Sequence, residues 1–598
     1  MYKRQNLFFA AVDTGSTNVG ALNSAATAYG YDPANNPVRA HAQFNTFTPG
    51  GNPSTAYIVW AEGRADYNDS RPDIPVLASP EKNGVPHVFA ITLPVNPLPP
   101  DPLSCVFVMH GGGDEYALFR PGVSARANMS LPLNDGIVVS PDDAFYINVQ
   151  NVLGLDNTDW FGYTPDVDPF SSAPRADPAP TAVVVNYTQR RVQWILGWLL
   201  GPNSPYPLEA ARVAMIGHSM GARGTSHLTR MRPDRFCAAV CYDPPGDLTI
   251  PPQPGQVNPL RGHWSMNLDT NLTYPGVGVL GITDVITATT RLSVLHRDLP
   301  LTRFYFGKRD EQGAAAWGTA QRAVLDTLND SRMGHMVLWD EREHAIPEWS
   351  LESNDATDGH PGPWPDVGQW VAPVRTYRAS AQYIVDTYRN NQSHPGFFSS
   401  DHDPLTALRQ PDPGPGDPDL GDPYGTWGGY FDWDTATIID TPTLWECTVF
   451  ATGLSAYSID NCPVAEITTD VVPRRSQAFS PAPGTTVLWT ATDAATGAGR
   501  QTGISVVESD GVVVVTGLVV TRDPNRVRLS IAPAPICGSA DFDGDGDTGT
   551  DLDIEAFFAC LGGSCCAACG SADFDGDGDV GTDLDVEAFF RVLGGGNC

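Results

Sequence analysis

Positive charge is scarce in this sequence, and no long apolar segment is present. Lysine occurs only three times in 598 residues, as Lys3, Lys82 and Lys308, and the formal net charge is −33. Such an excess of carboxylates repels a phosphate backbone, so we expect no nucleic-acid partner and favour cation binding or a saline, extracellular setting. No apolar run reaches the roughly 18 residues of a membrane helix, so we also expect no membrane span.

A signal peptide is missing as well. Residues Met1–Gln5, MYKRQ, resemble the translation of an adapter used in DNA sequencing libraries. We therefore expect a truncated metagenomic gene whose natural N-terminus, signal peptide included, has been lost. The missing leader excludes no compartment.

Cysteine is sparse along most of the chain and concentrated at its end. Six of the eleven cysteines lie beyond residue 536, which suggests disulfides and an oxidising compartment, as in a secreted or cell-surface bacterial protein. Their pairing stays open, because six cysteines allow fifteen connectivities. Cys447 and Cys462 are expected to form a further disulfide. Cys105, Cys237 and Cys241 lie in apolar strand-like segments and are expected to be buried free thiols.

The longest part of the chain, residues 41–409, alternates between two patterns. Apolar segments that end in glycine or aspartate read as buried strands, and segments such as residues 187–200 have apolar residues at helical spacing. This alternation predicts a mostly parallel sheet with helices on both faces.

The other segments predict smaller units. Residues 1–40 read as a strand, a turn and a strand, which resemble the last hairpin of a fibronectin type III domain. Residues 410–425 are a linker rich in proline, glycine and aspartate. Residues 426–533 hold short alternating strands and predict a β-sandwich. Residues 537–598 contain two copies of one motif, 32 residues apart.

One serine lies in a pattern typical of a catalytic nucleophile. The motif Gly-His-Ser-Met-Gly, with Ser219 at its centre, follows an apolar strand and precedes a helical segment. A sharp strand-to-helix turn exposes the serine Oγ at the carboxyl end of the sheet, and small flanking residues avoid clashes in that turn. Upstream, His110 and three glycines end another strand. Such a loop supplies one backbone N–H to an oxyanion hole, here Gly111 or Gly112, and Met220 supplies the other.

An acid and a histidine should follow the serine in that order. The stretch RFYFGKRD ends in Asp310, just past the carboxyl end of a strand, and His344 comes just past the end of the next strand. Asp243 and Asp340 are weaker candidates for the acid. His335 precedes its strand and so lies at the wrong end of the sheet. Ser219 would attack an acyl carbon, His344 would move the proton, and Asp310 would orient the imidazole.

The segment around the serine resembles a known group of proteins. SMGARGTSHLTRMRPDRFCAAVCYDPP, which begins at Ser219, is similar to the elbow region of secreted α/β-hydrolase esterases. That group includes feruloyl and acetylxylan esterases and polyhydroxyalkanoate depolymerases. The resemblance spans about Leu103–Trp349 and implies ester hydrolysis without a cofactor. Ala222 replaces a glycine that is frequent in the group.

An aromatic, proline-rich stretch, Asp159–Phe170, is open to two interpretations. It either lines an acyl or aromatic pocket or is a packed surface loop, which is the commoner case. It is not counted among the expected site residues.

The repeated motif DFDGDGD predicts a calcium site in each copy. Aspartates at loop positions one, three and five, with glycine at six, match the start of an EF-hand loop. Position twelve is Leu552 in one copy and Leu584 in the other, so the last carboxylate comes one residue early or one late. The candidate ligands are Asp541, Asp543, Asp545, Asp547, Asp551, Asp553, Asp573, Asp575, Asp577, Asp579, Asp583 and Asp585. The paired loops, each with one short helix, resemble a dockerin module. That resemblance implies structural Ca²⁺ and a cohesin-like or cell-surface partner.

The expected protein is thus a multidomain, secreted serine esterase. An α/β-hydrolase precedes an all-β sandwich and a small helical calcium module. The substrate is expected to be a carboxylic ester, such as one on an extracellular polysaccharide. Three alternatives stay open: a polyester depolymerase of the same fold, a serine peptidase of the same fold, and a surface adhesion or scaffold protein with an inactive hydrolase domain.

Overall fold

The structure is a computed structural model of the chain. It describes residues 38–39, 52–61, 85–94, 102–114, 116, 133–149, 152–166, 177–202, 204–244, 258, 260–263, 266–274, 278–287, 298–307, 327–328, 330–340, 381–398, 425–428, 430–453, 462, 464–534, 537–576 and 578–596. Two compact units are distinguished: residues 1–438, 447–477 and 516–527, and residues 439–446, 478–515 and 528–598. The domain boundaries expected from the sequence stay predictions.

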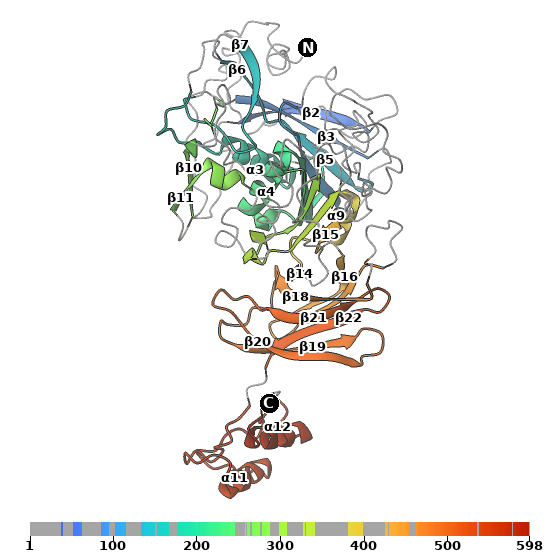
Figure 1. The fold of residues 1–598 in the computed structure, drawn as a ribbon, viewed down its shortest axis with the longest axis vertical. Coiled ribbons are helices and arrows are strands. Elements are labelled where there is room, and N and C mark those ends of the chain that lie inside the picture. Colours follow the sequence, from blue (N-terminus) through green and yellow to red (C-terminus); the bar gives the residue numbers. More distant parts are fainter. Residues whose placement is uncertain are drawn as a thin grey trace, which may run out of the picture. The chain divides into compact units, whose positions relative to one another are not determined.

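A ten-stranded, mostly parallel sheet forms the centre of the first unit (Figure 1). The order is β1-β2-β3-β5-β4-β8-β9-β12-β13-β15. Neighbours from β5 to β13 are parallel, and the other pairs are antiparallel. This mixed sheet with its helices is α/β-hydrolase-like. The strands are Val38–Arg39 (β1), Ser54–Ala61 (β2), Val85–Thr92 (β3), Leu103–Met109 (β4), Gly136–Pro141 (β5), Leu208–His218 (β8), Ala238–Tyr242 (β9), Leu301–Gly307 (β12), His335–Asp340 (β13) and Gly425–Trp427 (β15).

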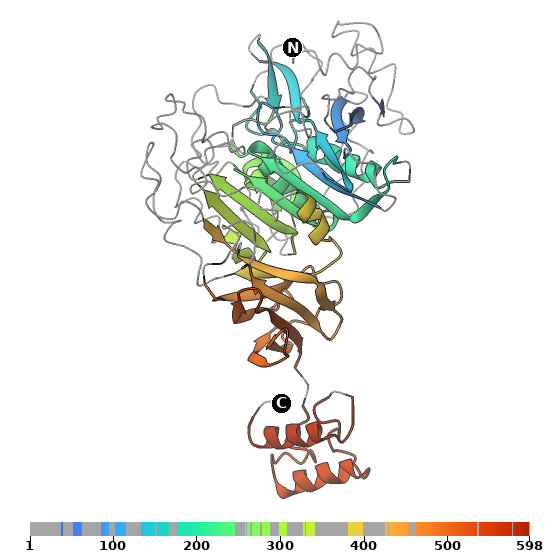
Figure 2. The same ribbon diagram turned by 90° about the vertical axis from the view of Figure 1, so that its right-hand side faces the viewer.

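Helices lie against the sheet in this unit (Figure 2), and buried apolar side chains of the sheet and of α3 form one core cluster. Every residue of β4 is buried, as expected for a central strand that is covered on both faces. Val192, Ile195 and Leu196 of α3 pack against Phe107 of β4 in one apolar cluster. The sequence predicted a helix over residues 187–200, and the structure confirms it. The helices are Tyr187–Leu199 (α3), Met220–Met231 (α4), Ile282–Ile286 (α5) and Ala381–Thr387 (α9), with a 3-10 turn at Pro233–Arg235 (η5).

Smaller sheets accompany the main one. Two hairpins are Ala144–Val149 with Val152–Asn157 (β6, β7) and Asp269–Tyr274 with Gly278–Gly281 (β10, β11). A three-stranded sheet has the order β14-β18-β21, and a five-stranded sheet has the order β16-β17-β22-β19-β20. Their strands are His394–Phe398 (β14), Phe431–Asp440 (β16), Trp445–Ala451 (β17), Glu466–Arg474 (β18), Thr486–Asp493 (β19), Gly499–Val506 (β20), Val515–Thr521 (β21) and Val527–Pro533 (β22).

Cys447 and Cys462 do not form the disulfide expected from the sequence. Both are buried free thiols, as are Cys105, Cys237 and Cys241, for which this was predicted. The N–H of Cys462 donates to the carbonyl of Thr452, five residues beyond Cys447. At about 3.3 Å per strand residue, this places the two cysteines roughly 16 Å apart, well beyond the roughly 7 Å that a disulfide spans.

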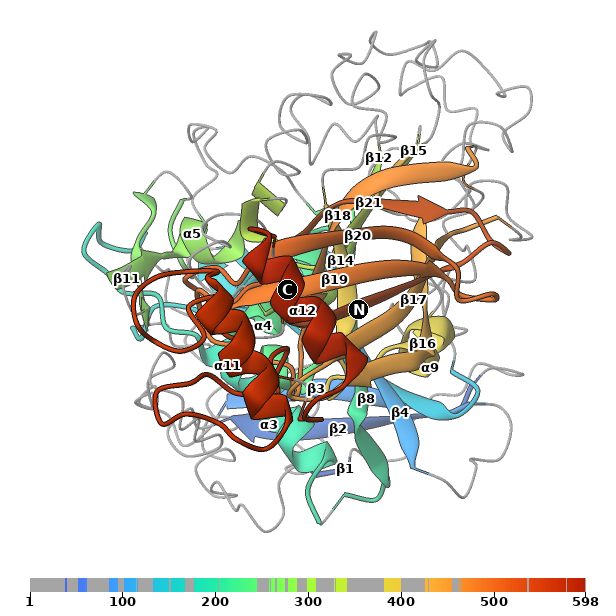
Figure 3. The same ribbon diagram turned by 90° about the horizontal axis from the view of Figure 1, so that it is seen from below.

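The C-terminal repeats form a small module around aromatic rings. Asp551–Leu561 (α11) and Asp583–Leu593 (α12) lie side by side (Figure 3), and the rings of Phe557 and Phe589 stack with centroids 4.1 Å apart. Phe542 and Phe574 complete the core. Two disulfides join neighbours in sequence, Cys560 with Cys565 and Cys566 with Cys569.

The described helices contain none that is long and apolar enough to cross a membrane.

We expect the first unit to lose stability as the pH falls from about 6.5 to about 4. Burial lowers the pKa of His227 to about 3, and the pKa of His335 and of His394 to about 4. The unfolded chain, whose histidines titrate near 6.5, therefore takes up protons first, and acid favours unfolding. Thermal unfolding at several pH values measures the slope.

His335→Asn provides the matched variant for this prediction. An amide can still donate to the Met333 carbonyl, as Nδ1 does at 2.9 Å, but it does not titrate. Between pH 6.5 and 4, the variant should show a flatter loss of stability than the wild type. Burial raises the pKa of Asp143 and of Asp156 to about 6, which works in the opposite direction over the same range. Equal slopes for variant and wild type would contradict the assignment of His335.

Candidate active site

Ser219 lies in a sharp turn between β8 and α4. Its backbone has φ 56° and ψ −122°, a conformation that residues with side chains rarely adopt. A Cβ on Gly217 would lie 2.1 Å from the carbonyl oxygen of Gly221, and a Cβ on Gly221 would lie 2.1 Å from that of Met109. Backbone segments therefore approach so closely that both positions require glycine. This is the geometry of a nucleophile elbow.

Gly217→Ala is expected to lower kcat/KM by at least about 10²-fold, because the new methyl group pushes the turn apart and displaces Ser219. Ester hydrolysis measures the effect. Ala222→Gly, in the first turn of α4, is the matched control, since it removes a methyl group instead of adding one. It should keep kcat/KM within about 3-fold of the wild type. Wild-type activity in Gly217→Ala would show that Ser219 is not the reacting group.

The glycine loop after β4 lies directly against the elbow. A Cβ on Gly111 would be 3.5 Å from the Cβ of Ser219, and a Cβ on Gly112 would be 3.9 Å from that of Met220. The loop and the first residue of α4 thus meet beside the serine. The residues whose backbone N–H groups the sequence assigned to an oxyanion hole, Gly111, Gly112 and Met220, therefore lie near one another at the N-terminus of α4, where the helix dipole favours negative charge.

Trp160, which the sequence analysis did not count among the expected site residues, packs against this loop. Its indole Nε1 donates to the His110 carbonyl at 3.1 Å. A Cβ on Gly224 of α4 would lie 2.5 Å from the Trp160 side chain, so the ring fills the space between loop and helix. Residues 159–164 are buried. The described part of the aromatic stretch is therefore mainly interior packing and not a surface loop.

Asn157 bonds to the same loop directly, and the Asp143 carboxylate holds the turn that carries Trp160. The Asp143 carboxylate accepts hydrogen bonds from the N–H groups of Thr158 and Trp160, both at 3.0 Å. Burial nevertheless raises the pKa of Asp143 to about 6. Oδ1 of Asn157 accepts from the Gly113 N–H at 2.8 Å. Hydrogen bonds therefore hold the glycine loop at both ends, at His110 by Trp160 and at Gly113 by Asn157.

A buried ion pair fixes the turn that carries Trp160. Asp159 and Trp160 have φ of 51° and 61°, so the turn is strained. The Asp159 carboxylate accepts from Arg261 Nε at 2.6 Å and lies 3.4 Å from a guanidinium nitrogen of Arg223. Burial lowers the pKa of Arg223 to about 10. Because Arg223 belongs to α4, this pair ties the strained turn to the helix that follows Ser219.

Asp310 and His344 lie outside the described residues, so their roles stay predictions. The strands that precede them are described. In β12, Gly307 pairs with Asp340 of β13, and both strands run parallel to β8. Because parallel strands end at the same edge of a sheet, the chain leaves β12 and β13 on the side where it leaves β8 for Ser219.

The weaker candidates are placed as follows. Asp243 comes directly after β9, is buried and has φ 45°. Asp340 is the last residue of β13. His335 is the first residue of β13, at the opposite edge from Ser219, and its pKa is lowered to about 4 by burial.

Each C-terminal loop gathers three carboxylates. Asp541, Asp543 and Asp553 place oxygens within 4.8 Å of one another, as do Asp573, Asp575 and Asp585. In each loop, Oδ1 of the first aspartate is buried and has no hydrogen-bond partner among the described residues. Both groups therefore fit a hard cation with oxygen ligands. Asp577 lies outside the described residues, and the other candidates, Asp545, Asp547, Asp551, Asp579 and Asp583, are not in these groups.

Asp553 closes the first loop onto α11. It lies at the third position of the helix and forms a capping box with Thr550. Its Oδ1 accepts from the Phe542 N–H at 2.7 Å, and its Oδ2 accepts from the Thr550 N–H at 2.8 Å. Although burial alone would raise it, these bonds lower the pKa of Asp553. Of the two candidates for the last carboxylate, the structure brings Asp553 into the group and leaves Asp551 exposed. Asp585 has the same role in the second copy.

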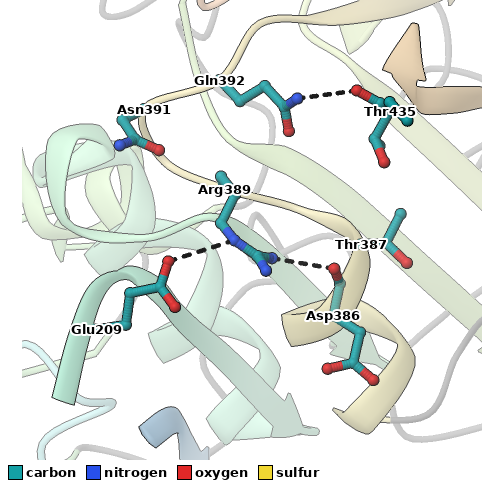
Figure 4. Close-up of a pocket in the computed structure, with 8 residues that line it drawn as sticks. Glu209, Asp386, Thr387, Arg389, Asn391, Gln392 and Thr435 are labelled. Carbon is teal, nitrogen blue, oxygen red and sulfur yellow. Dashed lines mark hydrogen bonds and ion pairs between the residues drawn. The ribbon is translucent and has the colours of Figure 1, made fainter. Parts of the chain in front are cut away.

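A separate polar cavity of about 540 Å³ lies at the other end of β8 (Figure 4). Its lining includes Glu209 at the start of β8, Arg389, Asn391 and Gln392. Figure 4 shows Arg389 between Glu209, 3.5 Å away, and the carbonyl of Asp386. Ser219 comes ten positions after Glu209, at the opposite end of β8 and up to roughly 33 Å away along an extended strand. This cavity is therefore not the site of Ser219.

No protein-family model and no curated protein matches this chain. Among solved structures, it is similar to an S-formylglutathione hydrolase from Agrobacterium tumefaciens, with 15% identity and a TM-score of 0.31 over 52% of this chain and 92% of that chain. It is also similar to a CE1 ferulic acid esterase from Anaeromyces mucronatus, with 12% identity and a TM-score of 0.28 over 52% of this chain and 92% of that chain. A third similar structure is the fluorophosphonate-binding serine hydrolase F of Staphylococcus aureus, with 14% identity and a TM-score of 0.27 over 49% of this chain and 92% of that chain. At such identities and TM-scores, these similarities establish neither an activity nor a substrate for this chain.

Proposed function

We propose that the chain is a serine hydrolase that cleaves carboxylic esters through an acyl-enzyme. The observation that carries the proposal is the strained elbow at Ser219 with the glycine loop packed against it. Backbone strain of this kind persists only where the surroundings enforce it, and it is concentrated at functional sites. Here two glycines leave room for the turn at Ser219, and a buried tryptophan and a buried ion pair hold the segments packed around it.

The proposed reaction has two halves. Oγ of Ser219 attacks the ester carbonyl carbon while His344 takes the hydroxyl proton, and the carbonyl oxygen becomes an oxyanion facing the N–H of Met220 and that of Gly111 or Gly112. Collapse of the intermediate breaks the bond to the alcohol, which leaves with the proton from the imidazole. A water molecule then repeats the attack and frees Ser219. Asp310 orients His344 throughout and stays ionised.

A panel of four substrates tests the reaction class: methyl ferulate, p-nitrophenyl acetate, p-nitrophenyl butyrate and a peptide p-nitroanilide. We expect turnover of the esters and none of the peptide. Preference for methyl ferulate supports an ester of a plant polysaccharide as substrate. Cleavage of the anilide alone would replace the esterase with a peptidase, and hydrolysis of insoluble polyhydroxybutyrate would favour a polyester depolymerase. Inactivity on all of them would favour a scaffold protein.

We also propose that the C-terminal module binds one Ca²⁺ in each loop. The support comes from the two three-carboxylate groups and from the buried oxygen without a partner in each group. Asp541, Asp543 and Asp553 would hold one ion, and Asp573, Asp575 and Asp585 the other. The cation neutralises carboxylates that otherwise repel one another, so binding stabilises the fold of the module and takes no part in hydrolysis.

The same module is proposed to anchor the enzyme outside the cell. Large apolar side chains are exposed at equivalent positions of its helices, Leu552 and Leu584, and Phe558 and Phe590. The last two rings are 6.2 Å apart, so the two copies contribute to one apolar surface. A cohesin-like domain is the proposed partner. Gel filtration of the protein with a cohesin domain should give a complex in calcium that dissociates in EGTA, and no complex under either condition would contradict this.

A further inference from the structure

His110 lies at the start of the glycine loop and makes a hydrogen bond at each ring nitrogen. The residue follows β4 and is fully buried, with its ring against that of Trp160 at 4.8 Å between centroids. Nδ1 is 2.8 Å from the carbonyl oxygen of Gly111. Nε2 is 2.9 Å from the backbone nitrogen of Asp143.

Both partners are backbone groups, which fixes the direction of each bond. A carbonyl oxygen only accepts, so Nδ1 carries a proton and donates to Gly111. A backbone N–H only donates, so Nε2 of the neutral ring accepts from Asp143. The neutral imidazole is therefore the Nδ1–H tautomer.

Protonation of the ring leaves the bond to Gly111 in place. Burial lowers the pKa of His110, but the Asp142 carboxylate, 3.3 Å from Nε2, together with the Gly111 carbonyl and the charge of Asp143, outweighs burial, so the pKa is raised overall. An added proton goes to Nε2, which then donates to Asp142 in place of accepting from Asp143. Nδ1 keeps its proton in both states.

The bond to the Gly111 carbonyl sets the direction of the next N–H. The Gly111–Gly112 peptide is trans, so the carbonyl of Gly111 and the N–H of Gly112 lie in one plane and point in opposite directions. The Asp114 N–H also donates to this carbonyl, at 3.3 Å. With the carbonyl held on the His110 side, the N–H of Gly112 faces away from the imidazole. The elbow lies against this loop, with Met220 nearest to Gly112.

We propose that His110 is a positioning residue for the oxyanion hole: its Nδ1–H holds the Gly111 carbonyl, and the N–H of Gly112 thereby faces the oxyanion beside Met220. This assignment rests on the proposed ester hydrolysis and selects Gly112 over Gly111 as the second donor. Loss of one oxyanion donor costs about 10²- to 10³-fold in kcat and little in substrate binding, because the charge develops only in the transition state.

Two variants of similar size distinguish the roles of the two ring nitrogens of His110. In His110→Asn, the amide nitrogen lies near the place of Nδ1 and can still donate to Gly111. In His110→Gln, the amide lies near the place of Nε2 and can still pair with Asp143, but the donor to Gly111 is lost. We expect His110→Asn to keep kcat on p-nitrophenyl acetate within about 5-fold of the wild type. His110→Gln should lose about 10²-fold in kcat with KM within about 3-fold.

The inhibition constant of a boronic acid is a second readout. If His110 only stabilised the fold, the two variants would not differ in this constant in the way predicted here. Such an inhibitor forms a tetrahedral, negatively charged adduct on the serine, so its inhibition constant should rise about 10²-fold in His110→Gln and stay near the wild-type value in His110→Asn. Circular dichroism and thermal melts check folding. If the glutamine variant does not fold, His110→Ala takes its place as the variant without the donor.

The outcomes distinguish this inference from the function on which it rests. If the wild type neither hydrolyses esters nor reacts with a fluorophosphonate, the proposed function fails. If the wild type is active and both variants lose kcat equally, or the asparagine variant loses more, the role of Nδ1–H is wrong while the function stands.

Discussion

Replacing Ser219 with alanine should abolish ester hydrolysis, with kcat at least about 10⁴-fold below the wild-type value. The nucleophile takes part in every step, and removal of one member of such a catalytic set costs nearly as much as removal of all of them. The fold should survive, because Ser219 is only partly buried and alanine leaves the two required glycines in place. Steady-state kinetics on p-nitrophenyl acetate measure the loss.

Ser226→Ala is the matched control for this loss. Ser226 is a buried serine of α4, seven residues after Ser219, and takes no part in the proposed chemistry. Its replacement should leave kcat within about 3-fold of the wild type. Equal turnover by Ser219→Ala and the wild type would mean that another group performs the reaction.

Removal of calcium should destabilise the C-terminal module and leave the hydrolase active. Three carboxylates of each loop converge within 4.8 Å, and the aspartates nearby raise the pKa of Asp543 in addition to desolvation. At a calcium concentration about 10³ times the dissociation constant, binding stabilises the fold by about 4 kcal/mol. For a unit of this size, EGTA should then lower the melting temperature of the module by about 15 °C or more. Calorimetry with and without EGTA measures the shift.

Paired aspartate substitutions locate the ligands. Asp541→Asn with Asp573→Asn removes the buried oxygens without partners and should give the low melting temperature even in calcium. Asp551→Asn with Asp583→Asn changes the same number of charges at exposed positions outside the two groups, and it should melt as the wild type does. If the second pair alone loses calcium binding, the last carboxylate of each loop has been assigned to the wrong residue.

Local patterns carried much of the information about the candidate site. The elbow could be predicted because its backbone contacts allow only glycine at positions 217 and 221, so the requirement is written into the sequence. The calcium loops could be predicted for the same reason, since alternate aspartates followed by glycine have a fixed geometry. The sequence could not choose between Asp551 and Asp553, because that choice depends on where α11 begins. The capping box at Thr550 places Asp553 inward.

Interactions between distant segments were beyond the sequence. Trp160 supports the loop after β4, fifty residues upstream, and its strained turn is held by Arg261, about a hundred residues downstream. Nothing in the neighbourhood of Trp160 indicates either contact. The disulfide expected between Cys447 and Cys462 was wrong for a related reason. Proximity in sequence suggested a bridge, but the pairing of Cys462 with Thr452 sets the two thiols apart.

The most direct test of the account is to label the protein with a fluorophosphonate and map the adduct by mass spectrometry. The elbow, the glycine loop and the supporting network predict one phosphonylated residue, Ser219, on the native protein and none after denaturation. An unmodified native protein, or an adduct on a different serine, would contradict the claim that this turn carries the nucleophile.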